Sequence, residues 1–436
     1  LATPPSLFPP VASFPPSSPP AREMRLIWLL ASLCASHALA PAHSRSYCPP
    51  LWRAARSSSA RMEEPARSGP SPEAWREFRQ QLITSGLKLT TDHSSDDAAE
   101  PSQRQIVAPG NEALLREQNM KLYEEYLAGN WAHESPVEEG GLLVRMPLEA
   151  QLTHFIRGGE GNGAVLANEL QLRLRKEISS LDDKDAEEER LESWLSNTPY
   201  CYRLCERFVT EQLEKLTTQA RQGHLTIDVH SLSGTLLQLY QRTSEEWQQV
   251  VLVLSNAGGS GASGVALNRP LHGRLNLQFA KLLLKQTGEA DALAPAFLDA
   301  FGTKACVYLG GPSQQEAGAI LVHGVHSLEG AVEVAPGTGI YTGGERAAIE
   351  AVSKGDASPL DFRWFVGRHK GLVTSDGSWR AVACARPIAL KQCLLLPKPL
   401  WHEVMELCGG ECATLSRLEI LKREDLADAD GGEEDE

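Results

Sequence analysis

The glycines of residues 258–264 have a spacing that could bind phosphate. Gly259, Gly261 and Gly264 spell Gly-x-Gly-x-x-Gly directly after the apolar run 250–255. In dinucleotide-binding proteins, the pyrophosphate rests on the N-terminus of a helix that follows the third glycine. Here that glycine is followed by Val-Ala-Leu-Asn-Arg-Pro, and the residue before a proline disfavours helix. The sequence therefore predicts a strand–loop–strand hairpin and no nucleotide or other cofactor.

Two cysteine pairs are candidates for a metal site. Cys201 with Cys205 and Cys408 with Cys412 each have three residues between them, whereas zinc sites usually use Cys-x-x-Cys. Both pairs lie on or next to apolar helix faces. We therefore expect buried structural thiols and no metal.

Other residues that could act as nucleophile, base or ligand lack partners in the sequence. Cys306, Cys384 and Cys393 lie in strand-like apolar runs, and no Gly-x-Ser-x-Gly elbow is present. His323 and His326 have no carboxylate at ligand spacing, so we expect both to be exposed loop histidines. No catalytic residue is predicted.

Six short motifs, in order, resemble the AlgH/YqgE family of bacteria and its plastid relatives in plants and algae. They are the paired-valine strand and glycine loop ending in Asn268-Arg269-Pro270, Val-Tyr-Leu-Gly-Gly-Pro at 307–312, Gly-Ile-Tyr-Thr-Gly-Gly at 339–344, Asp-Phe-Arg-Trp-Phe-x-Gly at 361–367, Trp-x-Ala-Val-Ala-Cys at 379–384, and Pro-Leu-Trp-x-Glu at 399–403. The resemblance implies the fold of that family. It implies no reaction, because the family has no established one.

The motifs of the resembled family supply a set of candidate ligand-binding groups. These are Asn268, Arg269, Gly310, Gly311, Pro312, Asp361 and Arg363. Glycine turns leave backbone N–H groups free to face an anion, and arginine adds a bidentate donor. One interpretation is a small pocket for an anionic or peptide ligand. The alternative is structural: the glycines serve tight hairpins, and Arg269 or Arg363 with Asp361 forms an internal ion pair.

One stretch departs from the family pattern. Relatives carry a tryptophan, then Gln-Leu and an acidic residue, soon after Phe-Phe-x-Gly. This chain has Arg368-His369-Lys370 after Gly367. If that stretch is the functional surface of the family, this chain is a diverged or inactive copy.

The fold class expected is α/β (α+β), a layered sheet-and-helix domain with an N-terminal helical extension. The predicted organisation is a non-translated or disordered leader at 1–23, a signal peptide at 24–38, a transit peptide at 39–72, a helical extension with linkers at 73–230, an AlgH/YqgE-like domain at 231–418 and an acidic disordered tail at 419–436. The apolar run after Arg25, followed by an Arg/Ser-rich stretch without acids, resembles a two-part address to the plastid stroma. The alternative is a secreted protein with a disordered linker.

The start of the family core has two candidates. Gly141 opens an apolar run that resembles the opening strand of the family, and so does Gly234. Relatives reach the paired-valine strand within about twenty residues, so the spacing favours Gly234. Residues 141–230 are then an insertion or an extra helical subdomain. The opposite choice, with Gly141 as the strand, stays open.

Periodicity and breakers predict the elements around these motifs. Helices are expected at 72–87, 111–130, 277–285, 295–301, 345–354 and 400–408. Strands are expected at 250–255, 307–309, 319–323, 331–334, 363–367, 380–385 and 393–396.

The overall charge limits the classes of partner. Net charge is −14 and the isoelectric point is near 5.4, which disfavours direct contact with phosphate backbones. The preferred function is a non-catalytic binding or regulatory module that acts through a protein partner. The alternative is a small-molecule hydrolase or transferase with an anion-binding glycine loop. No membrane span is predicted after the targeting segments, and the oligomeric state is open.

Overall fold

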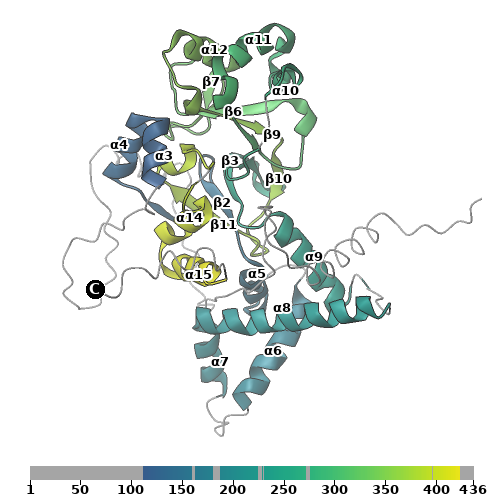
Figure 1. The fold of residues 1–436 in the computed structure, drawn as a ribbon. Helices are drawn as coiled ribbons and strands as arrows, with labels where there is room; N and C mark the ends of the chain where they lie inside the picture. Colours follow the sequence, from purple (N-terminus) through teal and green to yellow (C-terminus); the bar gives the residue numbers. More distant parts are fainter. Residues whose placement is uncertain are drawn as a thin grey trace, which may run out of the picture.

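The structure is a computed structural model that describes residues 111–159, 163–179, 187–223, 228, 230–271, 275–394 and 396–422. The predicted leader, signal peptide, transit peptide and helix at 72–87 lie outside these residues, as does most of the acidic tail. Figure 1 shows a body built on two sheets with a group of helices below it.

One sheet has six strands and is antiparallel throughout. Its order is β1-β11-β2-β3-β4-β10. The strands are β1 (Ala132–Glu134), β2 (Leu142–Arg145), β3 (Val250–Asn256), β4 (Ala262–Ala266), β10 (His369–Leu372) and β11 (Trp379–Cys384). The β3–β4 pair confirms the predicted hairpin, and its loop contains the short 3-10 helix η1 (Gly258–Ser260). Gly264 lies inside β4, so no helix follows the third glycine.

The second sheet has five strands in the order β5-β9-β6-β8-β7. Its strands are β5 (Cys306–Leu309), β6 (Ala319–His323), β7 (Ala331–Glu333), β8 (Tyr341–Gly343) and β9 (Phe362–Val366), with β5 and β9 parallel and the other pairs antiparallel. Helices α10 (Leu277–Leu283), α11 (Ala290–Phe301) and α12 (Glu345–Lys354) lie beside it at the top of Figure 1. Phe297 and Phe301 of α11 pack edge-on against Trp364 of β9, which fixes this helix layer on the sheet.

Five helices that follow β2 and precede β3 in the chain form a separate layer. They are α5 (Leu148–Ile156), α6 (Ala164–Ser179), α7 (Glu187–Ser196), α8 (Thr198–Arg221) and α9 (Leu232–Glu245). They share their own apolar core, which includes Phe155, Phe208 and Leu236. Because Leu142 pairs with Leu252, this group is inserted between two adjacent strands (Figure 1).

The preference for Gly234 as the start of the opening strand was therefore wrong. Gly234 lies in α9, whose N-cap Ser231 accepts a hydrogen bond from its amide at 3.1 Å. The strand beside β3 is β2, which begins one residue after Gly141. The local apolar pattern of 234–239 fits either element, and burial against the inserted helices decides for helix.

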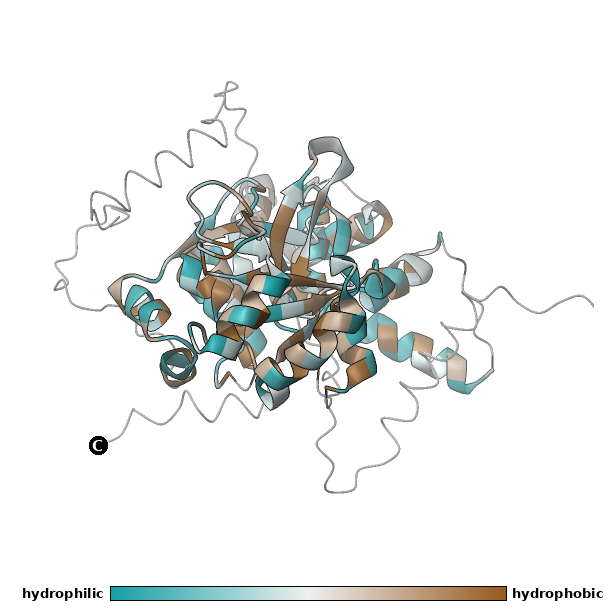
Figure 2. Ribbon diagram, turned by 90° about the horizontal axis from the view of Figure 1, so that it is seen from above, coloured by the Kyte–Doolittle hydropathy of each residue, from teal (hydrophilic) through white to brown (hydrophobic). Residues whose placement is uncertain are grey.

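The remaining helices pack on the outer face of the six-stranded sheet. They are α3 (Asn111–Gln118), α4 (Met120–Ala128), α13 (Arg386–Leu390), α14 (Leu400–Cys408) and α15 (Gly410–Ile420). The apolar core of the molecule lies between them and the strands, and Figure 2 shows hydrophobic strands in the centre of the fold. Glu419 is in α15, buried, and accepts a hydrogen bond from Tyr202 at 2.8 Å. The tail therefore begins later than residue 419.

Most other predicted elements are confirmed, with three corrections. The helix predicted at 111–130 is broken at Asn119, which has an extended backbone and caps α4 through its side chain. Residues 393 and 394 are not in a strand. Helix α11 begins at Ala290 and contains Pro295, where the sequence predicted a start at the proline. A proline in the second turn disrupts only the hydrogen bond toward the helix start, so the preceding residues stay helical. The other short 3-10 helices are η2 (Lys285–Thr287), η3 (Gly302–Lys304), η4 (Gln315–Ala317) and η5 (Pro359–Asp361).

The six-stranded sheet is strongly rolled. His369 is on edge strand β10 and Trp379 is on β11, and three strands separate them in the sheet order. In a flat sheet that separation is about 19 Å. Their ring centroids are 6.0 Å apart. The inner face of this roll holds a small apolar cluster made of strand residues such as Leu143, Val251 and Ala266.

Candidate functional site

The Asn-Arg-Pro motif carries the chain from one sheet to the other. After β4, Pro270 forms an antiparallel bridge with Tyr308 of β5. The amide of Leu309 donates to the carbonyl of Arg269 at 2.8 Å, and the amide of Leu271 donates to the carbonyl of Val307 at 2.9 Å. We call the contact of residues 268–271, 309–313 and 367–368 the sheet junction.

The glycines of the junction allow two segments to cross at van der Waals contact. A Cβ on Gly310 would lie 2.3 Å from the carbonyl oxygen of Gly367, and one on Gly311 would lie 2.3 Å from the carbonyl carbon of Arg368. The Gly310 amide donates to Val366 at 2.8 Å. These groups are engaged in the fold, and Pro312 next to them is exposed.

Asn268 and Arg269 hold the connection that leads into β3. The Asn268 side chain accepts from the amide of Val250 at 3.0 Å and donates to the carbonyl of Gln248 at 2.7 Å. The guanidinium of Arg269, which is half-buried, donates to the carbonyl of Trp247 and to that of Asn268. Both side chains therefore bind the backbone before and after the hairpin.

Arg269→Ala is expected to lower stability without preventing folding. The variant leaves the Trp247 carbonyl without its charged donor, and hydrogen bonds to charged groups contribute about 1.5–3 kcal/mol. Thermal unfolding of purified wild type and variant measures the effect. An unchanged melting temperature would contradict the structural role and would return Arg269 to the ligand-binding candidates.

Asp361 and Arg363 have separate partners. Asp361 closes a capping box with Ser358 and accepts a hydrogen bond from Asn119 at 2.6 Å. Arg363 is buried and donates to the carbonyls of Ala389 and Lys391. Burial lowers the pKa of the Arg363 guanidinium. The structure therefore uses Arg363 to fix the C-terminal end of α13, and not in an ion pair with Asp361.

The glycine loop and Arg269 are not in one pocket. They lie at opposite ends of β4, a strand of 5 residues, which spans about 16 Å. Within the loop, the Gly261 amide donates to the carbonyl of Gly258 at 2.9 Å. The proposed cooperation of loop amides and arginine on one anion is therefore not brought about by the fold.

The thiols and His323 lie in apolar surroundings, whereas His326 is exposed in a turn, as expected. Cys201 and Cys205 are buried on α8, which confirms their predicted core position. Burial raises the pKa of Cys306 and of Cys393 to about 11. His323 is buried in β6 and its Nε2 bonds the carbonyl of Gly343 at 3.1 Å, so the expectation of an exposed loop histidine was wrong for it. The strand it occupies places it on the covered face.

In residues 111–422, outside the gaps given above, no group of three or more His, Cys, Asp or Glu side chains is arranged to hold a metal ion. The described helices also include none that is long and apolar enough to cross a bilayer.

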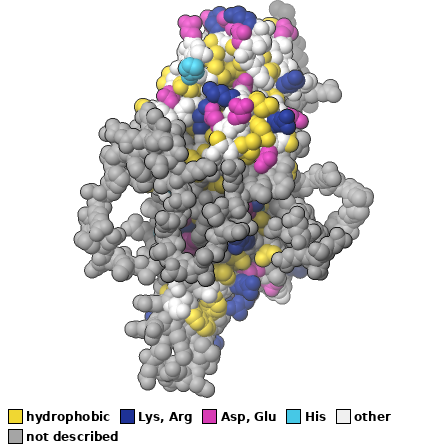
Figure 3. Space-filling model, turned by 90° about the vertical axis from the view of Figure 1, so that its left-hand side faces the viewer, with side chains coloured by type: hydrophobic (Ala, Val, Ile, Leu, Met, Phe, Trp, Pro, Cys, Tyr) yellow, Lys and Arg dark blue, Asp and Glu magenta, His cyan; other side chains and the backbone are white. Residues whose placement is uncertain are grey.

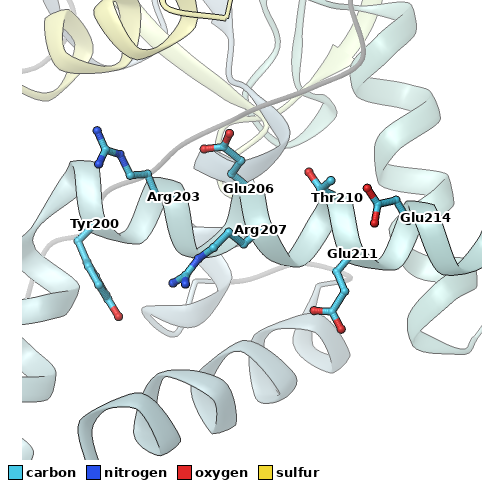
Figure 4. A pocket seen from close by; sticks show the side chains of 7 residues that line it. All are labelled: Tyr200, Arg203, Glu206, Arg207, Thr210, Glu211 and Glu214. Atoms are coloured by element: carbon cyan, nitrogen blue, oxygen red, sulfur yellow. The ribbon is translucent and has the colours of Figure 1, made fainter. Parts of the chain in front are cut away.

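A groove runs along the inserted helix α8. It has a volume of about 820 Å³ and is lined by Tyr200, Arg203, Glu206, Arg207, Thr210, Glu211 and Glu214 (Figure 4). Glu211 contacts Arg173 of α6 at 2.5 Å and Lys215 at 2.6 Å, and these two cations lower its pKa to about 2. In Figure 4 the charged side chains point to different sides of the helix, so the groove gathers no converging set of polar atoms.

A group that the sequence did not indicate lies on the inner face of the rolled sheet. Arg145 pairs directly with Trp379, and its amide donates to the carbonyl of Gln249 at 2.9 Å. His369 brings its ring to Trp379 across the roll. We call Arg145, Gln249, His369 and Trp379 the inner-face polar cluster. Only alternation along each strand points to it, and that pattern needs the strand register.

Comparison with known proteins places the second half of the chain. Residues 236–413 match the family model described as AlgH-like. The match starts inside α9 and leaves out β2, which the inserted helices separate from β3. The solution structure of the AlgH protein from Pseudomonas aeruginosa has 20% sequence identity and a TM-score of 0.22, and the match covers 31% of this chain and 66% of that one. No curated protein matches the chain.

Proposed function

We propose that this chain, whose residues 236–413 belong to the AlgH-like family, is a non-catalytic binding or regulatory module that acts through a protein partner. Any regulation of transcription then passes through that partner, because a net charge of −14 disfavours contact with a nucleic-acid backbone.

The observation that carries the proposal is the use of the motif residues. Asn268, Arg269, Gly310 and Arg363 bind backbone groups within the chain. A site for chemistry needs polar groups that converge on a substrate. These motif residues instead set the geometry of the sheet junction. This supports a role in which the family motifs build a binding surface.

The surface at the junction is apolar enough to receive a protein. Leu271 is 40% exposed and Leu309 is 36% exposed, and the pairing of 271 with 307 puts them on one face of the junction. Pro312 is exposed close by. Figure 3, which views another side, shows hydrophobic side chains among acidic and basic ones on the upper part of the molecule. Exposed apolar side chains that gather on one face are typical of interaction surfaces.

The thiols support the same conclusion. A cysteine nucleophile acts as the thiolate. Since burial raises the pKa of Cys306 and Cys393 to about 11, both remain protonated near neutral pH. This argues against the alternative of a hydrolase or transferase that uses these thiols.

Site-specific photo-crosslinking tests the proposal. A photoreactive phenylalanine at position 309 is expected to give a discrete protein adduct in cells that make the chain. The adduct should be lost when Leu271→Asp is added. The matched control carries the probe at Val332, which is 66% exposed on β7 at the far edge of the same sheet. No adduct at 309, or equal adducts at 309 and 332, would refute a partner at the junction.

A further inference from the structure

The inner-face polar cluster contains buried polar atoms that the fold leaves without hydrogen bonds. The Nε1 of Trp379, the Nε2 of His369 and the Oε1 of Gln249 have none. The side chains are almost fully buried, at 2%, 4% and 8% exposure. An unmade hydrogen bond at a buried group costs about 1–3 kcal/mol. One bound acceptor can complete the two ring nitrogens, whereas the Gln249 oxygen is itself an acceptor and needs a separate donor such as water.

The strand register places these side chains on one face. Val251 and Leu143 are opposite each other on the inner face, and Gln249 and Arg145 are two residues further along the same strands. Trp379 is the partner of Arg145. His369 is opposite Gly264, whose other partner is Val253 of the inner face. A methyl carbon of Val251 lies over Gly264, so the polar atoms of the cluster are next to the apolar part of the inner face.

The donors and charges of the cluster select the kind of ligand. The indole N–H of Trp379 can only donate, and so can the guanidinium of Arg145. Arg145 already donates to the carbonyl of Ser378 at 3.1 Å and to Thr243 Oγ1 at 3.5 Å, and its Nε lies 3.2 Å from Glu246 without hydrogen-bond alignment. Its guanidinium carbon is 5.3 Å from the Trp379 ring centre. A ligand with several acceptor atoms fits these donors.

The charges that act on His369 favour an anion beside it. Both of them are arginines, Arg269 and Arg145. The acids Glu246 and Asp376 act on Arg145, so Arg145 is largely compensated by groups of the chain. The positive field is therefore felt at the His369 side of the cluster.

We propose that the inner-face polar cluster is a binding site for one small oxyanion. Phosphate and carboxylate are the two groups whose oxygen atoms its donors would recognise. The oxyanion accepts hydrogen bonds from Trp379 Nε1 and His369 Nε2, and Arg145 lies beside it. Glu246, whose side chain is 18% exposed, marks the side from which the ligand enters. The site is independent of the partner surface at the sheet junction, so either proposal can fail alone.

The acidity of His369 gives the site a pH dependence. Burial, then Arg269 and Arg145, lower the pKa of His369 to about 4. A bound anion opposes these effects and raises that pKa, so binding takes up protons. Affinity for an anion of constant charge therefore rises as pH falls from about 7.5 to about 5.5.

Titration of the full chain with sulfate, phosphate and acetate tests the site. The indole N–H resonance of Trp379 is identified by its loss in Trp379→Phe. We expect a saturable shift of this resonance and a rise in melting temperature with the same anions. Sulfate keeps its charge across the pH range and reports the proton linkage. Phosphate against acetate distinguishes the two sources of oxyanion.

Two adjacent substitutions separate a site from general charge effects. His369→Leu is expected to weaken sulfate binding about ten- to a hundred-fold. Lys370→Gln, on the exposed neighbour, is expected to leave the affinity unchanged. If His369→Leu does not fold, the pH dependence of sulfate binding to wild type still decides. No saturable response to any of the three anions means that water alone fills the cluster and overturns the proposal, as does an affinity independent of pH.

Discussion

Glu403→Gln is expected to lower the free energy of unfolding by about 3–5 kcal/mol, because it leaves a buried lysine without its counter-charge. Glu403 forms an ion pair with Lys391, and the two side chains are 3% and 2% exposed. The carboxylate also accepts from Tyr126 at 2.7 Å and from Asn111 at 3.0 Å. Glutamine keeps the size and one acceptor oxygen, so Asn111 can still donate to it, while the Tyr126 hydroxyl must turn to accept from the new amide. Thermal unfolding should show a fall of roughly 6–20 °C.

The double variant Glu403→Gln/Lys391→Met tests the cause. Removing both charges of a buried pair is often close to neutral, whereas removing one is costly. The double variant should therefore be clearly more stable than Glu403→Gln. Glu350→Gln, in an exposed pair with Lys354 at 3.4 Å, is the surface control and should change stability by less than about 0.5 kcal/mol. A double variant no better than the single one would show that the Lys391 charge is not responsible.

Gly264→Val is expected to prevent normal folding or to cost about 3 kcal/mol or more. A Cβ at this position would lie 2.1 Å from the carbonyl oxygen of Leu252 and 2.8 Å from a methyl carbon of Val251. Both belong to β3, the central partner of β4. The strands cannot move apart without losing the ladder. Yield of soluble protein and the denaturant midpoint measure the effect.

The same substitution at Gly259 is the matched control. A Cβ on Gly259 meets nothing within 4 Å, and the residue is exposed in the hairpin loop. Gly259→Val should stay within about 0.5 kcal/mol of wild type. Equal damage at both positions would mean that the hairpin needs glycine for another reason. Gly264 is not among the glycines with positive φ, so close approach, and not a special backbone conformation, makes glycine necessary there.

Local pattern was enough to determine the hairpin and several helices. The β-branched run before Gly258 and the stop at Pro270 predicted β3 and β4. The helix Glu345–Lys354 ends at Gly355 in the left-handed conformation, as its sequence indicated. These elements depend on neighbours a few residues away, so their sequence carries the information.

Pairing over long sequence separations was decided only by the tertiary structure. Gly141 and Gly234 open equally apolar runs, and the choice between them depends on which one β3 accepts as its neighbour. Because β3 pairs with the run after Gly141, the five helices α5 to α9 are inserted between two adjacent strands. Spacing borrowed from relatives favoured the wrong run because it assumes that no layer of helices is inserted there.

The candidate site was beyond local pattern for a related reason. Arg363 and Asp361 look like an ion pair in sequence, yet the guanidinium of Arg363 on β9 binds carbonyls at the C-terminal end of α13. His369 lies between basic neighbours in a stretch that reads as surface, and only the roll of the six-stranded sheet brings it to Trp379. The sequence by itself determined which residues form strands and turns, because those preferences are local. The tertiary structure decided which polar groups are buried together, because strand register and sheet curvature arise only when distant strands pair.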